Sequence, residues 1–186
     1  MIINERREEG ENSIYIMSDI KKSKRKESKL QAIHNAYTIR KTITKLAENN
    51  FYISERKIEN IIAEKVKNFP DDDKKRVKDR TYEYFKIQIR NSTVRTVNYA
   101  SDISQHLRVA NTIFPTYMSE FEERRIEMDK AMACCNALQD ELQYIGECLY
   151  ADLNKYTNLV LEIQKEFNLI KALRQADNRF LKEIKK

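Results

Sequence analysis

Residues 121–149 read FEERRIEMDKAMACCNALQDELQYIGECL, and the apolar positions of this stretch recur three, four or seven residues apart. This spacing places them on one side of an α-helix and is typical of the seam between packed helices. Only Arg124 and Arg125 interrupt the seam. Its members are Phe121, Met128, Ala131, Cys135, Leu138, Leu142, Ile145 and Leu149.

The flanking segments predict further helices. Asp152 is the expected N-cap of a last helix, whose seam comprises Leu153, Tyr156, Val160, Ile163, Phe167 and Ile170. Upstream, residues 27–48 have helical spacing, and a short helix over about 54–68 begins after Ser54 as N-cap. Residues 71–73 are three aspartates that favour the start of a long helix reaching residue 113, with its apolar stripe at Phe85, Ile89, Val97, Ala100, Leu107 and Ala110.

Prolines and a capping motif separate these helices. Pro70 and Pro115 each follow a phenylalanine, and the residue before a proline disfavours helical geometry. Ser119 and Glu122 match a capping box at the start of the seam helix. The chain of 186 residues has only Gly 2 and Pro 2, too few for a fold rich in turns. We therefore predict an all-α, up-and-down antiparallel four-helix bundle over residues 27–186, with a short inserted helix and a mobile, charged N-terminal arm over residues 1–26.

The expected cellular location is based on the lengths of the apolar segments in the sequence. No run approaches the roughly 20 residues that cross a bilayer. The first residues, MIINERREEGENS, lack the apolar core of a secretory signal. We expect a cytoplasmic protein without a membrane partner.

The sequence also lacks the usual motifs of catalytic sites. There is no glycine-rich phosphate loop, and neither His34 nor His106 follows a glutamate by three residues as in bundle di-metal sites. Cys134, Cys135 and Cys148 do not have zinc-site spacing and are expected to pack as small apolar side chains. We predict no enzyme activity, no cofactor, no metal and no small-molecule substrate.

Basic residues are the main candidates for a binding surface, since the formal net charge is +6. A charge run is either a solvated face or a set of phosphate contacts, which give affinity without sequence choice. Tyr82 and Tyr84 are placed to stack on unpaired bases, or to pack in the core. The basic candidates are Lys74, Lys75, Arg76, Lys78, Arg80, Lys86, Arg90, Arg95, Arg108, Arg124 and Arg125.

Arg174 and Asp177 stand where the last seam predicts apolar residues, and a spacing of three places them on one helix face. One interpretation is a surface or inter-subunit salt bridge. The other is a polar recognition patch that includes Arg179 and Lys182.

Six short segments form a recognisable series along the chain: ESKL (27–30), VANTI (109–113), YMSEFEERR (117–125), AMACCNAL (131–138), KYTNLV (155–160) and LRQADNR (173–179). In this order they resemble the bacterial four-helix-bundle family that includes the accessory variability determinant (Avd) of diversity-generating retroelements, and more distantly the 23S rRNA intervening-sequence proteins. The chain departs from that family over residues 51–78, where it inserts a helix and the aspartates.

This resemblance implies a basic bundle that assembles into a homo-oligomer, a pentamer in the retroelement proteins. It implies a non-enzymatic partner of a reverse transcriptase that binds template RNA or an RNA–DNA hybrid. The alternative function is a structural bundle that mediates protein–protein assembly without nucleic acid.

Overall fold

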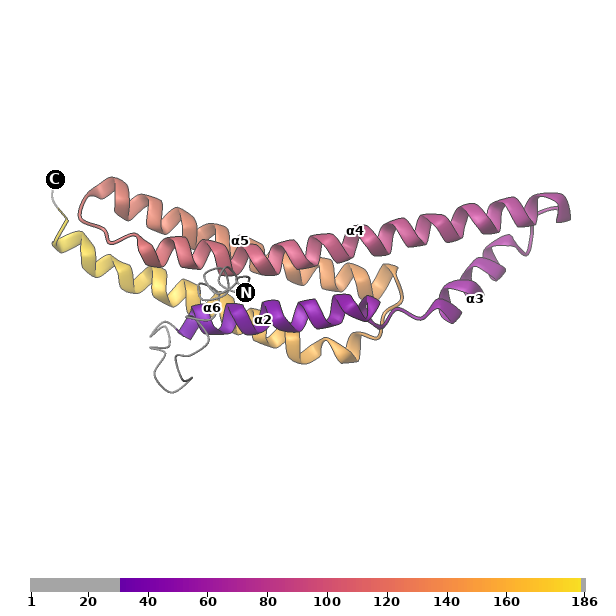
Figure 1. Ribbon diagram of the computed structural model, residues 1–186, viewed down its shortest axis with the longest axis horizontal. Helices are drawn as coiled ribbons and strands as arrows, with labels where there is room; N and C mark the ends of the chain where they lie inside the picture. The colour runs from indigo at the N-terminus through magenta and orange to yellow at the C-terminus, as the bar shows by residue number, and fades with distance from the viewer. Residues whose placement is uncertain (1–30, 185–186) are drawn as a thin grey trace, which may run out of the picture. The chain divides into compact units, whose positions relative to one another are not determined.

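The computed structural model describes residues 31–184, which form one compact, all-helical unit without extended strands (Figure 1). Three short 3₁₀ segments, η2 (Asn50–Tyr52), η3 (Leu153–Lys155) and η4 (Asp177–Lys182), adjoin the main helices. The five α-helices are α2 (Gln31–Glu48), α3 (Glu55–Val66), α4 (Asp71–Thr112), α5 (Met118–Cys148) and α6 (Thr157–Ala176). The prediction of an all-α fold is confirmed, whereas the predicted arm over residues 1–26 and the helix start at residue 27 lie outside the described residues.

The helices pack around a shared apolar core. α4 contacts α2, α3 and α5, and α6 contacts α2 and α5. The predicted α5 seam is confirmed, because all eight of its residues are buried. The inserted α3 has its main contact with α4, against which it packs Ile58, Ile62 and Val66. None of the helices in residues 31–184 combines the length and apolar character that a membrane crossing requires.

The seam of α6 differs from the predicted one. Leu153 is 47% exposed because it belongs to η3, before α6 begins at Thr157. Leu159 and Glu166 are buried, while Val160 and Phe167 are only half-buried. Asp152 does cap a helix, but its carboxylate accepts a hydrogen bond from the Asn154 backbone within η3. The predicted α6 seam is therefore one residue too late at two positions, Val160 and Phe167.

Part of the buried face of α4 is lined by small and polar side chains. Ser92, Thr96, Ala100 and Ser104 recur every four residues and are all buried. Thr96 satisfies its hydroxyl by donating to the Ser92 backbone carbonyl at 2.6 Å. Because small and polar side chains fill part of this buried face, α4 carries only a weak apolar signal.

The capping predictions have different outcomes. Ser54 caps α3 by accepting a hydrogen bond from the Lys57 backbone, as expected. The predicted capping box at Ser119 and Glu122 is wrong, because α5 begins at Met118. Glu120 performs this task instead, accepting from the backbone N–H groups of Thr116 and Tyr117 at 2.8 and 3.0 Å.

Candidate nucleic-acid interface

The predicted basic residues fall into two groups at opposite ends of α4. A helix rises 1.5 Å per residue, so Arg76 and Arg108 lie about 48 Å apart along its axis. The α4 cluster comprises Lys74, Lys75, Arg76, Lys78, Arg80, Lys86, Arg90 and Arg95. The turn cluster comprises Arg108, Arg124, Arg125, Arg174, Arg179 and Lys182. The two groups come nearest each other on α4 at Arg95 and Arg108, which are about 20 Å apart along the axis.

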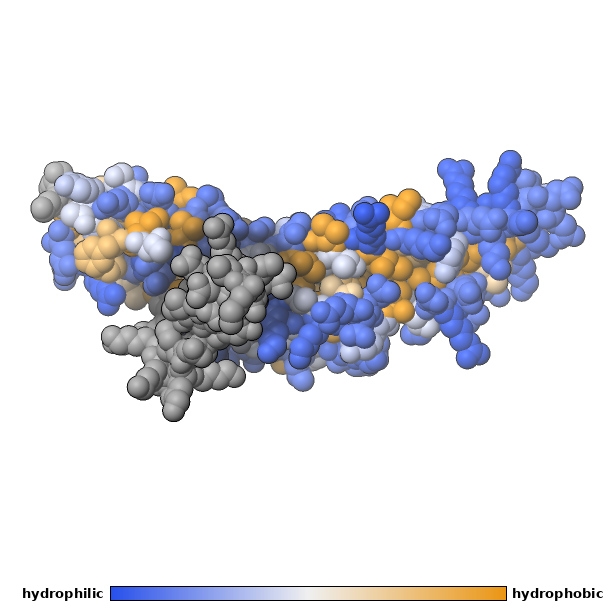
Figure 2. Space-filling model, in the orientation of Figure 1, coloured by the Kyte–Doolittle hydropathy of each residue, from blue (hydrophilic) through white to orange (hydrophobic). Residues whose placement is uncertain are grey.

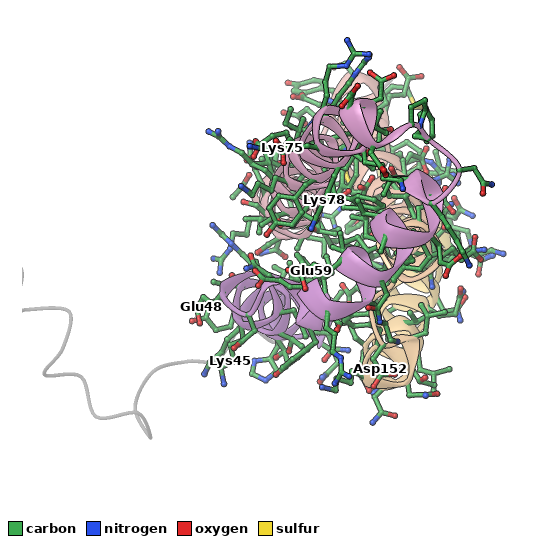
Figure 3. The ribbon with its side chains drawn as sticks, turned by 90° about the vertical axis from the view of Figure 1, so that its right-hand side faces the viewer. Lys45, Glu48, Glu59, Lys75, Lys78 and Asp152 are labelled. Carbon is green, nitrogen blue, oxygen red and sulfur yellow. The ribbon has the colours of Figure 1, made fainter. Side chains whose placement is uncertain are left out.

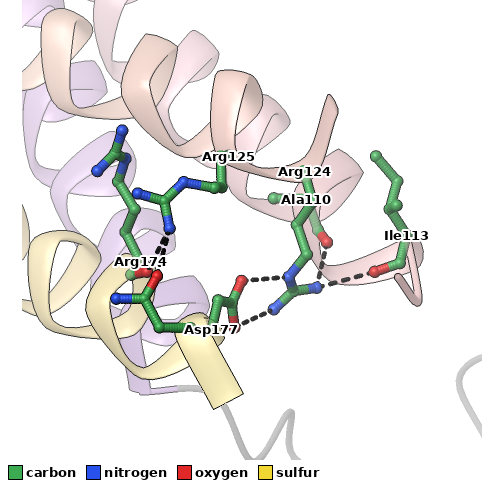
Figure 4. Close-up of polar contacts among 7 residues, drawn as sticks. Ala110, Ile113, Arg124, Arg125, Arg174 and Asp177 are labelled. Carbon is green, nitrogen blue, oxygen red and sulfur yellow. Dashed lines mark hydrogen bonds and ion pairs between the residues drawn. The ribbon is translucent and has the colours of Figure 1, made fainter. Parts of the chain in front are cut away.

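Arg124, in the turn cluster, is buried and paired within the chain. Its Nε lies 2.5 Å from the Asp177 carboxylate, and its Nη1 donates to the backbone carbonyls of Ala110 and Ile113 (Figure 4). The Arg124 side chain is only 10% exposed and that of Asp177 is fully buried. This pair joins the last turn of α4, the first turns of α5 and the start of η4.

Arg174 and Asp177 do not pair with each other. Arg174 binds Asp129 of α5, with its Nε 2.6 Å from the carboxylate, whereas Asp177 is buried against Arg124. The interface at these two residues stays a prediction. Arg125 donates to the Arg174 carbonyl at 3.4 Å and to the Asn178 side chain at 2.8 Å. The predicted pairing assumed that both residues stayed on the α6 surface, but their partners come from α5.

The α4 cluster is more open to solvent. Three of its cations, Lys74, Arg76 and Lys86, each pair with an acidic residue three positions earlier. Exposed ion pairs of this kind contribute little to stability. Arg95 pairs with Glu141 of α5 at 3.1 Å. Within residues 31–184, four exposed members of this cluster have no ion pair: Lys75, Lys78, Arg80 and Arg90.

Five residues of α4 form what we call the basic stripe. Lys75, Lys78, Tyr82, Lys86 and Arg90 are three or four positions apart, so they share one face over about 22 Å. Lys86 Nζ lies 4.6 Å from the centre of the Tyr82 ring. Figure 3, viewed along the bundle from the α3–α4 end, shows Lys75 and Lys78 on the same side of α4, and hydrophilic side chains cover this end in Figure 2. Tyr84 lies on another face and is 58% exposed.

The basic stripe leads into a groove of about 360 Å³ between α3, η2 and α4. Tyr82, Lys86 and Arg90 line the groove from α4. Sequence reasoning missed the groove because it exists only when α3 folds back along α4. The α3–α4 groove brings two of the four cations of the basic stripe, Lys86 and Arg90, beside an apolar floor.

The turn that borders this groove has an unusual backbone. Asn50, Phe51 and Tyr52 have φ of 46°, 53° and 53°, a left-handed region that side chains with a Cβ disfavour. The Tyr156 hydroxyl holds the turn by donating to the Phe51 carbonyl, and the two rings pack 6.5 Å apart. Burial raises the pKa of Tyr156, so its hydroxyl remains a donor at neutral pH. The start of α6 thereby fixes the connection between α2 and α3.

A second polar group joins α4 to α5 away from the basic stripe. His106 Nδ1 lies 2.7 Å from a Glu127 oxygen, and the other Glu127 oxygen lies 2.6 Å from Lys130 Nζ. Burial alone raises the Glu127 pKa, but hydrogen bonds from Lys130 and His106 outweigh it and hold the pKa below its usual value. The sequence contained no signal for this partner of His106, because Glu127 is 21 residues away.

The described part of the chain contains no group of three or more His, Cys, Asp or Glu side chains that is arranged to hold a metal ion. Cys135 is buried in the α5 seam as expected, Cys134 is half-buried, and Cys148 is exposed. Comparison with family models, with curated proteins and with solved structures finds no match to this chain.

Proposed function

We propose that this chain is a non-enzymatic nucleic-acid-binding protein that assists a reverse transcriptase of a diversity-generating retroelement by holding template RNA or an RNA–DNA hybrid. The basic stripe is the observation that carries this proposal. The resemblance to the Avd family is the reason for proposing a reverse transcriptase as the partner. We also propose that the fold is an up-and-down four-helix bundle into which α3 is inserted. The chain directions support this topology, because α2 and α5 run opposite to α4 and α6 (Figure 1).

The mechanism is electrostatic. Arg and Lys side chains that contact phosphates release condensed counterions, which gives affinity without sequence choice. The four cations of the basic stripe lie on one helix, whose rigidity keeps them aligned along a strand. A homo-oligomer would repeat the basic stripe and raise the effective affinity for one long RNA.

Reversing three cations of the basic stripe tests this proposal. We expect Lys75→Glu, Lys78→Glu and Arg90→Glu together to weaken RNA binding by at least about tenfold, because each lost phosphate contact removes a salt-dependent contribution. The logarithm of the wild-type association constant should fall with the logarithm of salt concentration with a slope of about −3, as four contacts on a single strand predict. Fluorescence anisotropy with a labelled RNA across a salt series measures both.

The control makes the same charge change at the other end of α4. Arg108, Arg179 and Lys182 are exposed and have no ion pair within residues 31–184. The triple variant Arg108→Glu, Arg179→Glu and Lys182→Glu should retain affinity within about threefold of the wild type once net charge is matched. If the two triple variants lose the same amount of RNA affinity, the loss is a general effect of net charge and the basic stripe is not the binding surface. RNA binding that does not depend on salt would also contradict the proposal.

An exposed apolar row on α4 favours the alternative function, protein–protein assembly. Tyr84, Ile87 and Val94 are spaced three and seven residues apart and are each more than half exposed, as in a helix seam that lacks its partner. We propose that this row contacts a second copy of the chain or the polymerase. The pentamer that the family resemblance implies is one such assembly.

Charged substitutions in this row test the assembly. Because burying a new carboxylate is costly, Tyr84→Glu with Ile87→Glu should reduce a homo-oligomer to monomers, as light scattering after size-exclusion chromatography measures. Ile126→Glu is the matched control, since Ile126 is exposed to a similar degree on α5. An unchanged mass for the double variant would place the contact elsewhere.

A further inference from the structure

We propose that the α3–α4 groove binds one unstacked nucleotide of a single-stranded nucleic acid, with the base on the groove's apolar floor and the phosphate at Arg90. This inference rests on the proposed function and specifies where and how the strand is held. It assigns a role to α3, the inserted helix.

The floor of the α3–α4 groove suits the flat face of a base. Ile58 comes from α3, and Phe85 and Ile89 come from the facing side of α4. Ile58 and Phe85 are buried at the base of the groove, and the half-buried Tyr82 and Ile89 side chains are the part of the floor that a base can reach. The volume of about 360 Å³ falls within the range of small-ligand sites.

The rim carries cations for a phosphate. Arg90 is exposed, lines the groove and has no ion pair in the described part of the chain. Its planar guanidinium is suited to two hydrogen bonds with one phosphate. Lys86 adds a second positive charge, although its Nζ also forms an ion pair with the Glu83 carboxylate at 2.9 Å. Lys75 and Lys78 continue the same face, so the strand has a charged path beyond the groove.

The opposite rim carries groups for the edge of a base. Glu55 begins α3, and Asn50 precedes it in the strained turn; both line the groove. A carboxylate accepts hydrogen bonds and cannot donate, so Glu55 facing position 4 of a pyrimidine favours cytosine, which has an amino group there, over uracil, which has a carbonyl. Phe51 and Tyr52, which follow Asn50, have left-handed φ values that bulky side chains rarely adopt, and strain of this kind is concentrated at ligand sites. Here Tyr156 holds that strain and keeps Asn50 on the rim.

The test measures the affinity of the full chain for short labelled oligocytidine and oligouridine by fluorescence anisotropy. The wild type should prefer oligocytidine by about fivefold or more, since one carboxylate–amino contact is worth about 1 kcal/mol or more. Glu55→Gln should reduce that preference severalfold because an amide is a neutral and weaker acceptor. Arg90→Gln should lower affinity for both strands severalfold, as expected of a phosphate contact.

Arg108→Gln is the control for Arg90→Gln, because Arg108 is an exposed arginine of the same helix outside the groove. Circular dichroism checks that the variants fold, and all three positions are exposed. A photoreactive iodocytidine strand should cross-link to peptides from residues 50–58 or 82–94. If the wild type binds both strands but Arg90→Gln matches Arg108→Gln and cross-links map elsewhere, the groove assignment is overturned while the proposed function stands. If the wild type binds neither strand, both are overturned.

Discussion

Replacing Arg124 with methionine should lower the free energy of unfolding by about 3–5 kcal/mol, because it leaves the Asp177 carboxylate buried without its counter-charge. Removing one partner of a buried pair is more damaging than removing both, since the remaining charge keeps its desolvation cost. In a chain of this length the loss corresponds to a melting temperature lower by roughly 10 °C. Urea unfolding followed by circular dichroism measures the change.

Arg124 also satisfies the end of α4. The last carbonyl groups of a helix have no partner within the helix, and Arg124 Nη1 donates to those of Ala110 and Ile113. Arg124→Met with Asp177→Leu should therefore recover only part of the lost stability. The double variant removes the unpaired charge but leaves both carbonyls without this donor.

Arg174→Met is the matched control, since it breaks a salt bridge between the same two parts of the chain. The Arg174 and Asp129 side chains are 32% and 46% exposed, and such pairs are worth about 1 kcal/mol or less. If the two methionine variants have equal stability, burial of the Arg124–Asp177 pair has no energetic consequence and the prediction is wrong.

The sequence alone predicted the features of the fold that depend on local spacing. The α5 seam follows from apolar residues on one side of a single helix, and Ser54 caps α3 through a backbone group three residues away. The interruption at Arg124 was visible too, but its partner was not. Asp177 is 53 residues from Arg124, and only the packing of α6 on α5 brings them together.

The candidate site was less predictable. The basic stripe follows from helical spacing once α4 is known to be one helix, whereas the groove needs α3 to fold back and the α2–α3 turn to adopt its left-handed backbone. The exposed face of α4 could not be separated from its buried face by hydrophobicity, because Ser92 and Thr96 are buried while Ile87 and Val94 are exposed. Small polar residues pack on the buried face of α4 because of their size, and a pattern based on hydrophobicity cannot detect them.

Glu166 is the residue that departs most from the expected core, and it predicts a strong pH dependence of stability. It lies in the α6 seam between Ile163 and Ile170, and its side chain is fully buried. Neither of its carboxylate oxygens has a hydrogen-bond partner in the described part of the chain. Burial raises the pKa of Glu166 to about 8, and the Asn35 amide, which lies near the carboxylate without forming a well-aligned hydrogen bond, only partly opposes this shift.

The direction of the pH effect follows from linkage. In the unfolded chain Glu166 ionises near 4.5, so between pH 4.5 and about 8 the folded protein holds a proton that the unfolded chain has released. Stability should therefore decrease as pH rises through this window and level off above pH 8. This one group accounts for a loss of about 4 kcal/mol between pH 5 and pH 9.

Glu166→Gln should remove this dependence, because an amide has nearly the same shape and does not ionise. We expect the variant to be more stable than the wild type at pH 9 by several kcal/mol, and nearly equal to it at pH 5. Urea unfolding at five pH values and one protein concentration measures the difference between the two curves, in which the contributions of all other titrating groups cancel.

Glu162→Gln is the control that separates burial from charge. Glu162 lies one turn earlier on α6, its side chain is 54% exposed, and its charge adds less than burial does to the rise in the Glu166 pKa, so its substitution should reduce the pH dependence of stability only slightly. Parallel curves for the wild type and Glu166→Gln would mean that Glu166 titrates in the folded protein as it does in water. That result would require the α6 seam to open to solvent at Glu166, and rapid amide exchange around residues 163–170 would then have to accompany it.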